Sequence, residues 1–165
     1  MIEEKIYLNL GKITLFVFIC CSIIIGIVGF DIFTAKARDI KRRVDMGALV
    51  EALDLYHLKY GRYPEAVDEW RGWDVSYAVG GKGDFLKILK DDGFLKKSAN
   101  DPVNDTFNHY RYQRHERGGF GCERPFYILQ VTAFETADGN RGRGECPDFN
   151  WAAELPNGYT IQRFE

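Results

Sequence analysis

The apolar and polar positions divide the first third of the chain into two stretches with different patterns. Residues 13–30 carry no charged side chain, and an apolar run of about 18 residues forms a helix roughly 27 Å long, close to the thickness of a bilayer core. A small protein has no interior that could surround such a helix, so the pattern predicts a transmembrane helix over residues 13–35. A buried core helix and a cleaved signal peptide are the alternatives.

The second stretch, residues 36–61, is amphipathic. Its apolar residues recur at steps of three and four, which predicts that the helix continues with one face on a domain. These residues are Val44, Ala48, Leu49, Ala52, Leu53, Tyr56 and Tyr60. Gly61 can end the helix in the left-handed conformation, and Pro64 prevents its continuation. Residues 1–12 mix charges of both signs and are interpreted as a leader or a short cytoplasmic segment.

The remaining chain shows strand patterns and turn signals. We expect an irregular connection over 65–83, a short helix over 85–90 with Asp84 as its N-cap, and three strands over 109–114, 126–135 and 159–164. About 130 residues remain outside the anchor, enough for one small domain, 36–165. The predicted fold class is therefore α+β: a long N-terminal membrane-spanning helix that continues into a small domain with an antiparallel sheet.

Composition and motifs argue against several function classes. The 22 Lys and Arg residues nearly balance the 24 Asp and Glu residues, so we expect no nucleic-acid partner. His57, His109 and His115 belong to no metal or catalytic motif, and no nucleotide-binding fingerprint is present. We therefore do not expect an enzyme. The run 141–144, Arg-Gly-Arg-Gly, is interpreted as a solvated loop tip.

The four cysteines form two pairs with different meanings. Cys20 and Cys21 lie in the apolar run, where they behave as small hydrophobic residues. Cys122 and Cys146 lie in Gly-rich, turn-like settings without metal-site spacing, so a disulfide is the simplest interpretation and two unpaired thiols are the alternative. Closing this loop of about 24 residues would stabilise the domain by roughly 3 to 4 kcal/mol. A disulfide also implies an oxidising compartment outside the cytoplasm.

A basic cluster after the apolar run points the other way. Its members are Lys36, Arg38, Lys41, Arg42 and Arg43. Taken alone, the positive-inside rule places this flank in the cytoplasm. We favour the extracytoplasmic placement that the disulfide requires. The small-x-small sequence at residues 35–37 also leaves signal-peptide cleavage open.

Oxygen-bearing side chains raise the question of calcium. Asn104, Asp105, Asp138 and Asn140 could contribute ligands to Ca²⁺, which binds six to eight oxygen atoms. Their spacing matches no EF-hand, and the alternative is that they only form turns. No other cofactor is expected.

Three stretches resemble a known family when taken together. Residues 49–64, LVEALDLYHLKYGRYP, are followed by an Asp101-Pro102 loop that leads into Tyr110-x-Tyr112, and then by the strand PFYILQVTAFET, residues 125–136. In this order they resemble type II secretion pseudopilins and type IV pilin-like proteins, some of which bind Ca²⁺ in a loop near the C-terminus.

The resemblance implies a structural subunit of a pseudopilus or pilus-like filament. Such a subunit is a single-pass protein of the inner membrane with an extracytoplasmic domain. Its partners are membrane lipid, other pilin-like subunits and the platform membrane protein of the secretion machine. Packing of the helix on the domain is expected from Leu49, Leu53, Tyr56, Tyr63 and Pro64.

The chain also departs from the family pattern. Val17 stands where members usually carry a Glu, and Lys12 stands where they carry the Gly before the cleavage site. A tip-like minor subunit or a permanently anchored relative fits these differences. The alternative function is a membrane-anchored extracytoplasmic binding module that uses an aromatic surface around Trp70 and Trp73. An anchored enzyme ranks third.

Overall fold

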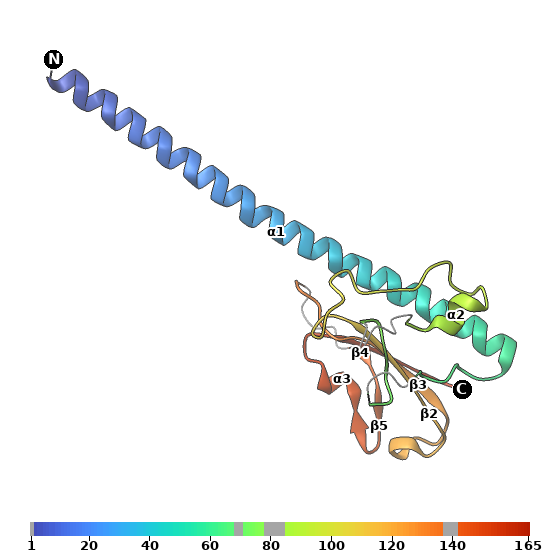
Figure 1. The fold of residues 1–165 in the computed structure, drawn as a ribbon. Coiled ribbons are helices and arrows are strands. Elements are labelled where there is room, and N and C mark those ends of the chain that lie inside the picture. The colour runs from blue at the N-terminus through green and yellow to red at the C-terminus, as the bar shows by residue number, and fades with distance from the viewer. Residues whose placement is uncertain (1, 68–70, 78–84, 137–141) are drawn as a thin grey trace. The chain divides into compact units, whose positions relative to one another are not determined.

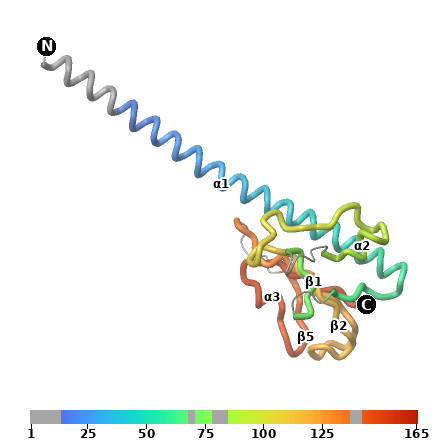
Figure 2. The backbone as a smooth tube through the Cα atoms, in the orientation of Figure 1, coloured from blue at the N-terminus to red at the C-terminus, as the bar shows by residue number. Residues whose placement is uncertain are grey.

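The computed structural model describes residues 2–67, 71–77, 85–136 and 142–165, with side chains from residue 14 onward (Figures 1 and 2). Helix α1 spans Ile2–Tyr60. By its internal contacts the chain divides into two units, Met1–Ala37 and Arg38–Glu165. Each unit is described separately below.

The first unit is the apolar part of α1. From Thr14 onward the helix contains a stretch that is long and apolar enough to cross a bilayer, and none of that stretch is buried. Large apolar side chains such as Phe18, Ile25 and Phe33 are exposed along it. This observation confirms the expected long N-terminal apolar helix and is consistent with a single-pass membrane anchor.

The second unit contains the rest of α1 and a five-stranded sheet in the order β1-β2-β3-β7-β4 (Figure 1). The strands of this sheet are β1 Asp74–Val75, β2 Tyr110–His115, β3 Phe126–Val131, β4 Gly142–Arg143 and β7 Tyr159–Phe164. All neighbouring pairs are antiparallel except β4 and β7. The small elements are α2 Lys87–Asp91, a 3₁₀ turn at Gly119–Gly121, α3 Trp151–Glu154, and the pair β5 Glu145–Cys146 and β6 Phe149–Asn150. The α+β layout predicted from the sequence is therefore present.

The sheet carries a core on each face. Side chains alternate between the faces of a strand, and along β3 Tyr127 and Leu129 belong to one buried cluster whereas Phe126 and Ile128 belong to another. The first cluster, here called the inner core, includes Leu49 and Leu53 of α1. The second, the outer core, contains Trp73, Val75, Cys122, Phe126, Ile128 and Trp151.

The element boundaries differ in places from those predicted. Helix α2 begins at Lys87 instead of residue 85, and the residue before it, Leu86, has a left-handed backbone with φ 47°. Its amide donates to a carboxylate oxygen of Asp74, 3.0 Å away. Asp84, the expected N-cap, lies outside the described residues. Strand β3 ends at Val131, four residues early, because the chain beyond it leaves the ladder to reach α1.

The end of α1 is as expected, but its packing face was partly wrong. Gly61 has φ 72° and its amide donates to the carbonyl of His57 over 2.8 Å, which is the predicted left-handed cap. Val44, Ala48 and Tyr60, however, are exposed. Charged residues take their place on the buried face, because Asp39 and Arg42 there neutralise each other.

Candidate functional site

The inner face of α1 holds the predicted packing residues. Leu49 and Leu53 are fully buried, Tyr63 is nearly so, and Tyr56 is half-buried against the inner core. The carbonyl of Pro64 accepts a hydrogen bond from the Tyr112 hydroxyl at 2.7 Å. All five residues therefore lie between the helix and the sheet, or at the loop that joins them.

The opposite face of α1 in the second unit exposes a row of large apolar side chains, with the charged Glu51 among them. Ile40, Val44, Leu55 and Leu58 are 62, 65, 44 and 81% exposed. Their spacing of 4, 11 and 3 residues places them on one side of a 3.6-residue helix, and Gly47 lies on the same side between them. A shallow hollow of about 560 Å³ opens beside Gly47, Glu51, Leu55 and Leu58. We call Ile40, Val44, Leu55 and Leu58 the outer stripe.

A buried group of charges joins α1 to two loops near the start of the second unit. The Arg42 side chain is fully buried and contacts three carboxylates. Its Nε and NH2 atoms donate to Asp101 at 2.7 and 3.0 Å, and its NH1 atom donates to Asp39 and Glu135 at 2.7 and 2.8 Å. Arg38 donates from Nε to Glu135 at 2.8 Å. We call these five residues the Arg42 network.

The network stabilises the charged form of each member that it shifts. Burial opposes the charge on Arg42, but the hydrogen bonds to Asp101 and Asp39 outweigh it and raise the pKa of Arg42. Burial likewise acts to raise the pKa of Asp39, yet bonds from the amides of Glu135 and Thr136 lower it overall. The hydrogen bond from Arg38 lowers the pKa of Glu135. Arg42, Asp39 and Glu135 are therefore charged at neutral pH.

Three members of the basic cluster form ion pairs in the folded protein. Arg38, Lys41 and Arg42 each have a carboxylate partner within the second unit, with Asp45 as the partner of Lys41. The sequence pattern treated these cations as a flank of the membrane segment. In the structure Arg38 and Arg42 also join α1 to the carboxylate of Glu135.

The disulfide pairing expected from the sequence is present. Cys122 and Cys146 are bonded, with their Cα atoms 5.2 Å apart. The amide nitrogen of Gln162 lies 3.8 Å from the sulfur of Cys122 and 3.5 Å from that of Cys146. The bond ties the turn before β3 to β5 and so closes the outer core.

Of the four residues proposed for a calcium site, the structure describes Asn104 and Asp105, and both form turns. The Asn104 side chain exchanges hydrogen bonds with Ser76, and the Asp105 carboxylate accepts the amides of Phe107 and Asn108. Asp138 and Asn140 lie outside the described residues. Among the residues that the structure describes, no cluster of three or more acidic, His or Cys side chains could hold a metal ion. The geometry at Asn104 and Asp105 matches the alternative of turn formation.

Of the two residues expected to form an aromatic surface, Trp70 and Trp73, the structure describes Trp73, and it is buried. Trp73 is 9% exposed, and its ring lies under the Arg111 guanidinium at 4.3 Å. Trp70 lies outside the described residues. The exposed aromatic rings of the outer layer belong instead to Phe120, Phe149 and Phe164.

Two of the three histidines are held in the neutral form by the outer layer. Burial lowers the pKa of His109 to about 4, helped by the nearby charge of Arg111, and burial lowers that of His115 to about 4. The Nε2 atom of each ring is buried and has no hydrogen-bond partner among the described residues. His115 packs against Phe120, Phe126 and Trp151. These contacts are those of structural side chains.

Comparisons with known proteins add no relative: no protein-family model, curated protein or solved structure matches the chain. The arrangement therefore has to be interpreted from its own geometry. It consists of a long apolar helix, a small sheet packed on one side of that helix's continuation, and an exposed apolar stripe on the other side.

Proposed function

We propose that this protein is a structural subunit of a pseudopilus or type IV pilus-like filament, anchored in the inner membrane before assembly. The apolar span of α1 would lie in lipid until the subunit is extracted, and would then pack against the same span of other subunits. Its partners would be membrane lipid, other pilin-like subunits and a platform membrane protein. The subunit would act by packing and would catalyse no reaction.

The outer stripe is the observation that supports this proposal best. Lipid can cover the span, but Leu55 and Leu58 lie about 25 residues beyond residue 30, roughly 38 Å along a helix. Four large apolar side chains in water are costly, at about 25 cal/mol per Å² of apolar surface. An isolated anchor has no reason to present such a row beyond the membrane, whereas a subunit that packs helix against helix does.

The disulfide supports the proposed orientation. A disulfide persists outside the reducing cytoplasm. The bond between Cys122 and Cys146 lies in the folded head, the second unit, and therefore favours an extracytoplasmic head.

Cysteine crosslinking in native membranes tests the proposal. In a background with Cys20 and Cys21 replaced by Ala, a variant with cysteines at both Val44 and Leu58 should give ladders of crosslinked subunits when the assembly machinery is present, because each subunit can then bond to two neighbours. The control is a variant with one cysteine at the exposed Lys97, outside the outer stripe, which should give no ladder. Monomers from the Val44 and Leu58 variant would contradict the filament proposal and favour the membrane-anchored binding module instead.

A further inference from the structure

Phe107 is the most exposed aromatic residue among those that the structure describes. It is 79% exposed, and Val103, on the same loop between α2 and β2, is 41% exposed. Single exposed apolar residues are common on protein surfaces. Whether this ring has a partner therefore depends on how firmly it is held and on what lies within its reach.

A turn holds the backbone of Phe107 in place. The Asp105 carboxylate accepts hydrogen bonds from the amides of Phe107 and Asn108, at 2.9 and 2.7 Å. The carbonyl of Phe107 accepts another from the Thr132 hydroxyl at 2.7 Å. The backbone is therefore fixed on both sides of an exposed side chain. Such an ordered protrusion loses little conformational freedom when a partner buries it.

The loop that carries Phe107 is attached to the first turns of α1 in the second unit. Asp101, at the start of the loop, belongs to the Arg42 network. The segment that follows β3 and contains Thr132 reaches the same part of the helix, because the amide of Thr136 donates to Asp39 at 2.7 Å. Four residues of chain span at most about 14 Å. Phe107 therefore lies at the edge of the head where α1 enters it.

A bilayer that holds the apolar span comes close to this edge of the head. Helix α1 is continuous from Ile2 to Tyr60, and Asp39 is six residues beyond the exposed Phe33 of the span, which is about 9 Å along a helix. The headgroup layer on either side of a bilayer core is about 5 to 8 Å thick. Because the helix tethers the head to the bilayer, even weak insertion of a side chain becomes an intramolecular event. Lipid is therefore within reach of the Phe107 loop.

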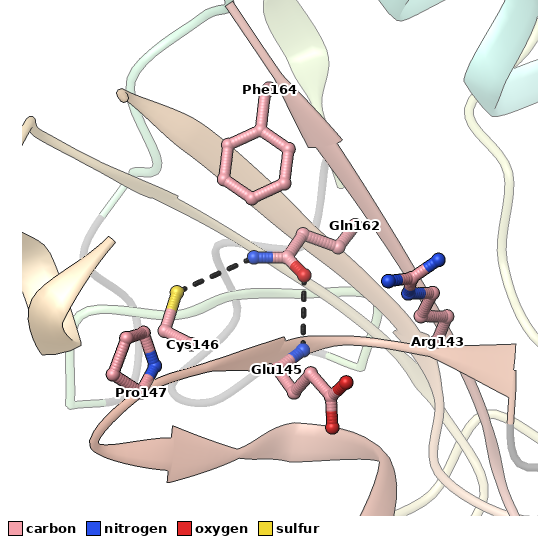
Figure 3. A pocket seen from close by; sticks show the side chains of 6 residues that line it. All are labelled: Arg143, Glu145, Cys146, Pro147, Gln162 and Phe164. Atoms are coloured by element: carbon pink, nitrogen blue, oxygen red, sulfur yellow. Dashed lines mark hydrogen bonds between the residues drawn. The ribbon is translucent and has the colours of Figure 1, made fainter. Parts of the chain in front are cut away.

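A second exposed apolar feature of the head has no such neighbour. A cleft of about 590 Å³ beside β7 is lined by Phe164, Arg143 and Glu145, among others (Figure 3). Arg143 and Glu145 are both exposed and carry opposite charges, so they favour neither a cationic nor an anionic partner. Phe164 pairs with the first residue of β3, whereas the Phe107 loop lies beside the end of that strand. Lipid that reaches Phe107 therefore does not account for this cleft.

From these features we infer that Phe107 inserts into the membrane surface beside the span and holds the head against the lipid. Apolar side chains of surface-bound segments reach about 5 to 10 Å into the boundary between headgroups and acyl chains. Asp105, the charged residue of the same turn, stays among the headgroups. The inference rests on the membrane-anchored state in the proposed function. It does not require a filament, because the contact is lost when the subunit leaves the lipid.

Quenching by spin-labelled lipid tests the inference on the full chain, reconstituted into phosphatidylcholine vesicles without any other protein. In a background with Cys20 and Cys21 replaced by Ala, a cysteine at the exposed Thr106 carries the fluorophore NBD, so that Phe107 is retained. Phosphatidylcholine with a nitroxide near the headgroup end of its acyl chain should quench this label at least twofold. Phe107→Ser should abolish most of the quenching, and Phe107→Leu, which keeps an apolar side chain, should preserve it.

Two controls separate this inference from the proposed function. Leu58→Ser, which removes an equally exposed apolar side chain from the outer stripe, should leave the quenching at Thr106 unchanged. A label at Ile25, in the span, should be quenched in every variant. Quenching at Ile25 without quenching at Thr106, or equal quenching at Thr106 with Phe107 and with Ser in its place, would overturn the inference and leave the membrane anchor intact. If neither label is quenched, the span is not in lipid and the proposed function fails as well.

Discussion

Each face of the sheet buries an arginine, and the two arginines are stabilised differently. Arg42 in the inner layer contacts three carboxylates, and the hydrogen bonds to them raise its pKa. Arg111 in the outer layer has one carboxylate partner, the half-exposed Glu154, together with the Gln130 side chain and the Trp73 ring. Burial lowers the pKa of Arg111, and Glu154 only partly offsets this effect.

The difference shows which interactions stabilise each layer. The inner layer joins α1 to distant loops through matched charges, over a large apolar contact. The outer layer has short elements, several aromatic rings and a covalent crosslink. We therefore expect the inner layer to be sensitive to loss of a charge and the outer layer to be sensitive to reduction and to mild acid.

The largest expected effect comes from removing the buried cation. Arg42→Met keeps much of the side-chain volume but leaves Asp39 and Asp101 without their partner, which should destabilise the head by about 3–5 kcal/mol. Urea unfolding in detergent, followed by near-UV circular dichroism, measures the change. The matched control is Arg43→Met, an exposed neighbour over the Phe134 ring, which should cost less than about 1 kcal/mol. Equal effects of the two substitutions would contradict the role of the network.

Breaking the crosslink should have a slightly smaller effect. Replacing Cys122 and Cys146 together by Ala should destabilise the head by roughly 3–4 kcal/mol, because the loop they close is no longer constrained in the unfolded chain. Dithiothreitol should produce a similar loss in the wild type and none in the variant. The same urea titration measures both. A wild type that is unaffected by full reduction would show that the outer layer does not depend on the bond.

The two layers should lose their contributions to stability over different pH ranges. The pKa of His109 falls from 6.5 to about 4 on folding, so the unfolded chain takes up the proton first and stability falls as the pH drops from 6.5 to 4. For His109 the loss approaches about 3 kcal/mol. Asp39 and Glu135, whose pKa values are lowered from 3.8 and 4.5, lose their contribution only at lower pH.

His109→Phe provides the control for this prediction. It removes the titrating group, so the unfolding free energy should depend less on pH between 6.5 and 4, and the decline below that range should remain. Parallel pH profiles for the variant and the wild type would show that His109 does not cause the acid sensitivity. Urea titrations at several pH values across this range provide the measurement.

Local patterns were enough to predict much of the fold. The apolar run, the Gly61 cap and strand β7 need only neighbouring residues, and the Cys122–Cys146 pair had no competing cysteine in the polar part of the chain. The shortest elements, β1 and β4 to β6, were missed because two residues carry no periodic signal.

The Arg42 network could not be found from the sequence in the same way. Asp101 lies 59 residues from Arg42, and Glu135 lies 93 residues from it. Each residue also had a local explanation: a basic flank for Arg42, a turn for Asp101 and a strand end for Glu135. Only the path of the chain brings them together.

The position of the Arg42 network along α1 also has a mechanical consequence. Any pull on the apolar part of the helix is transmitted along its backbone and reaches Asp39 and Arg42 before it reaches Leu49 or Leu53. The ion pairs of Arg42, which tolerate little displacement, therefore bear the force first. The apolar contacts of Leu49 and Leu53 bear it only after those pairs break. The head would resist being peeled from its helix up to a threshold force and would then separate abruptly.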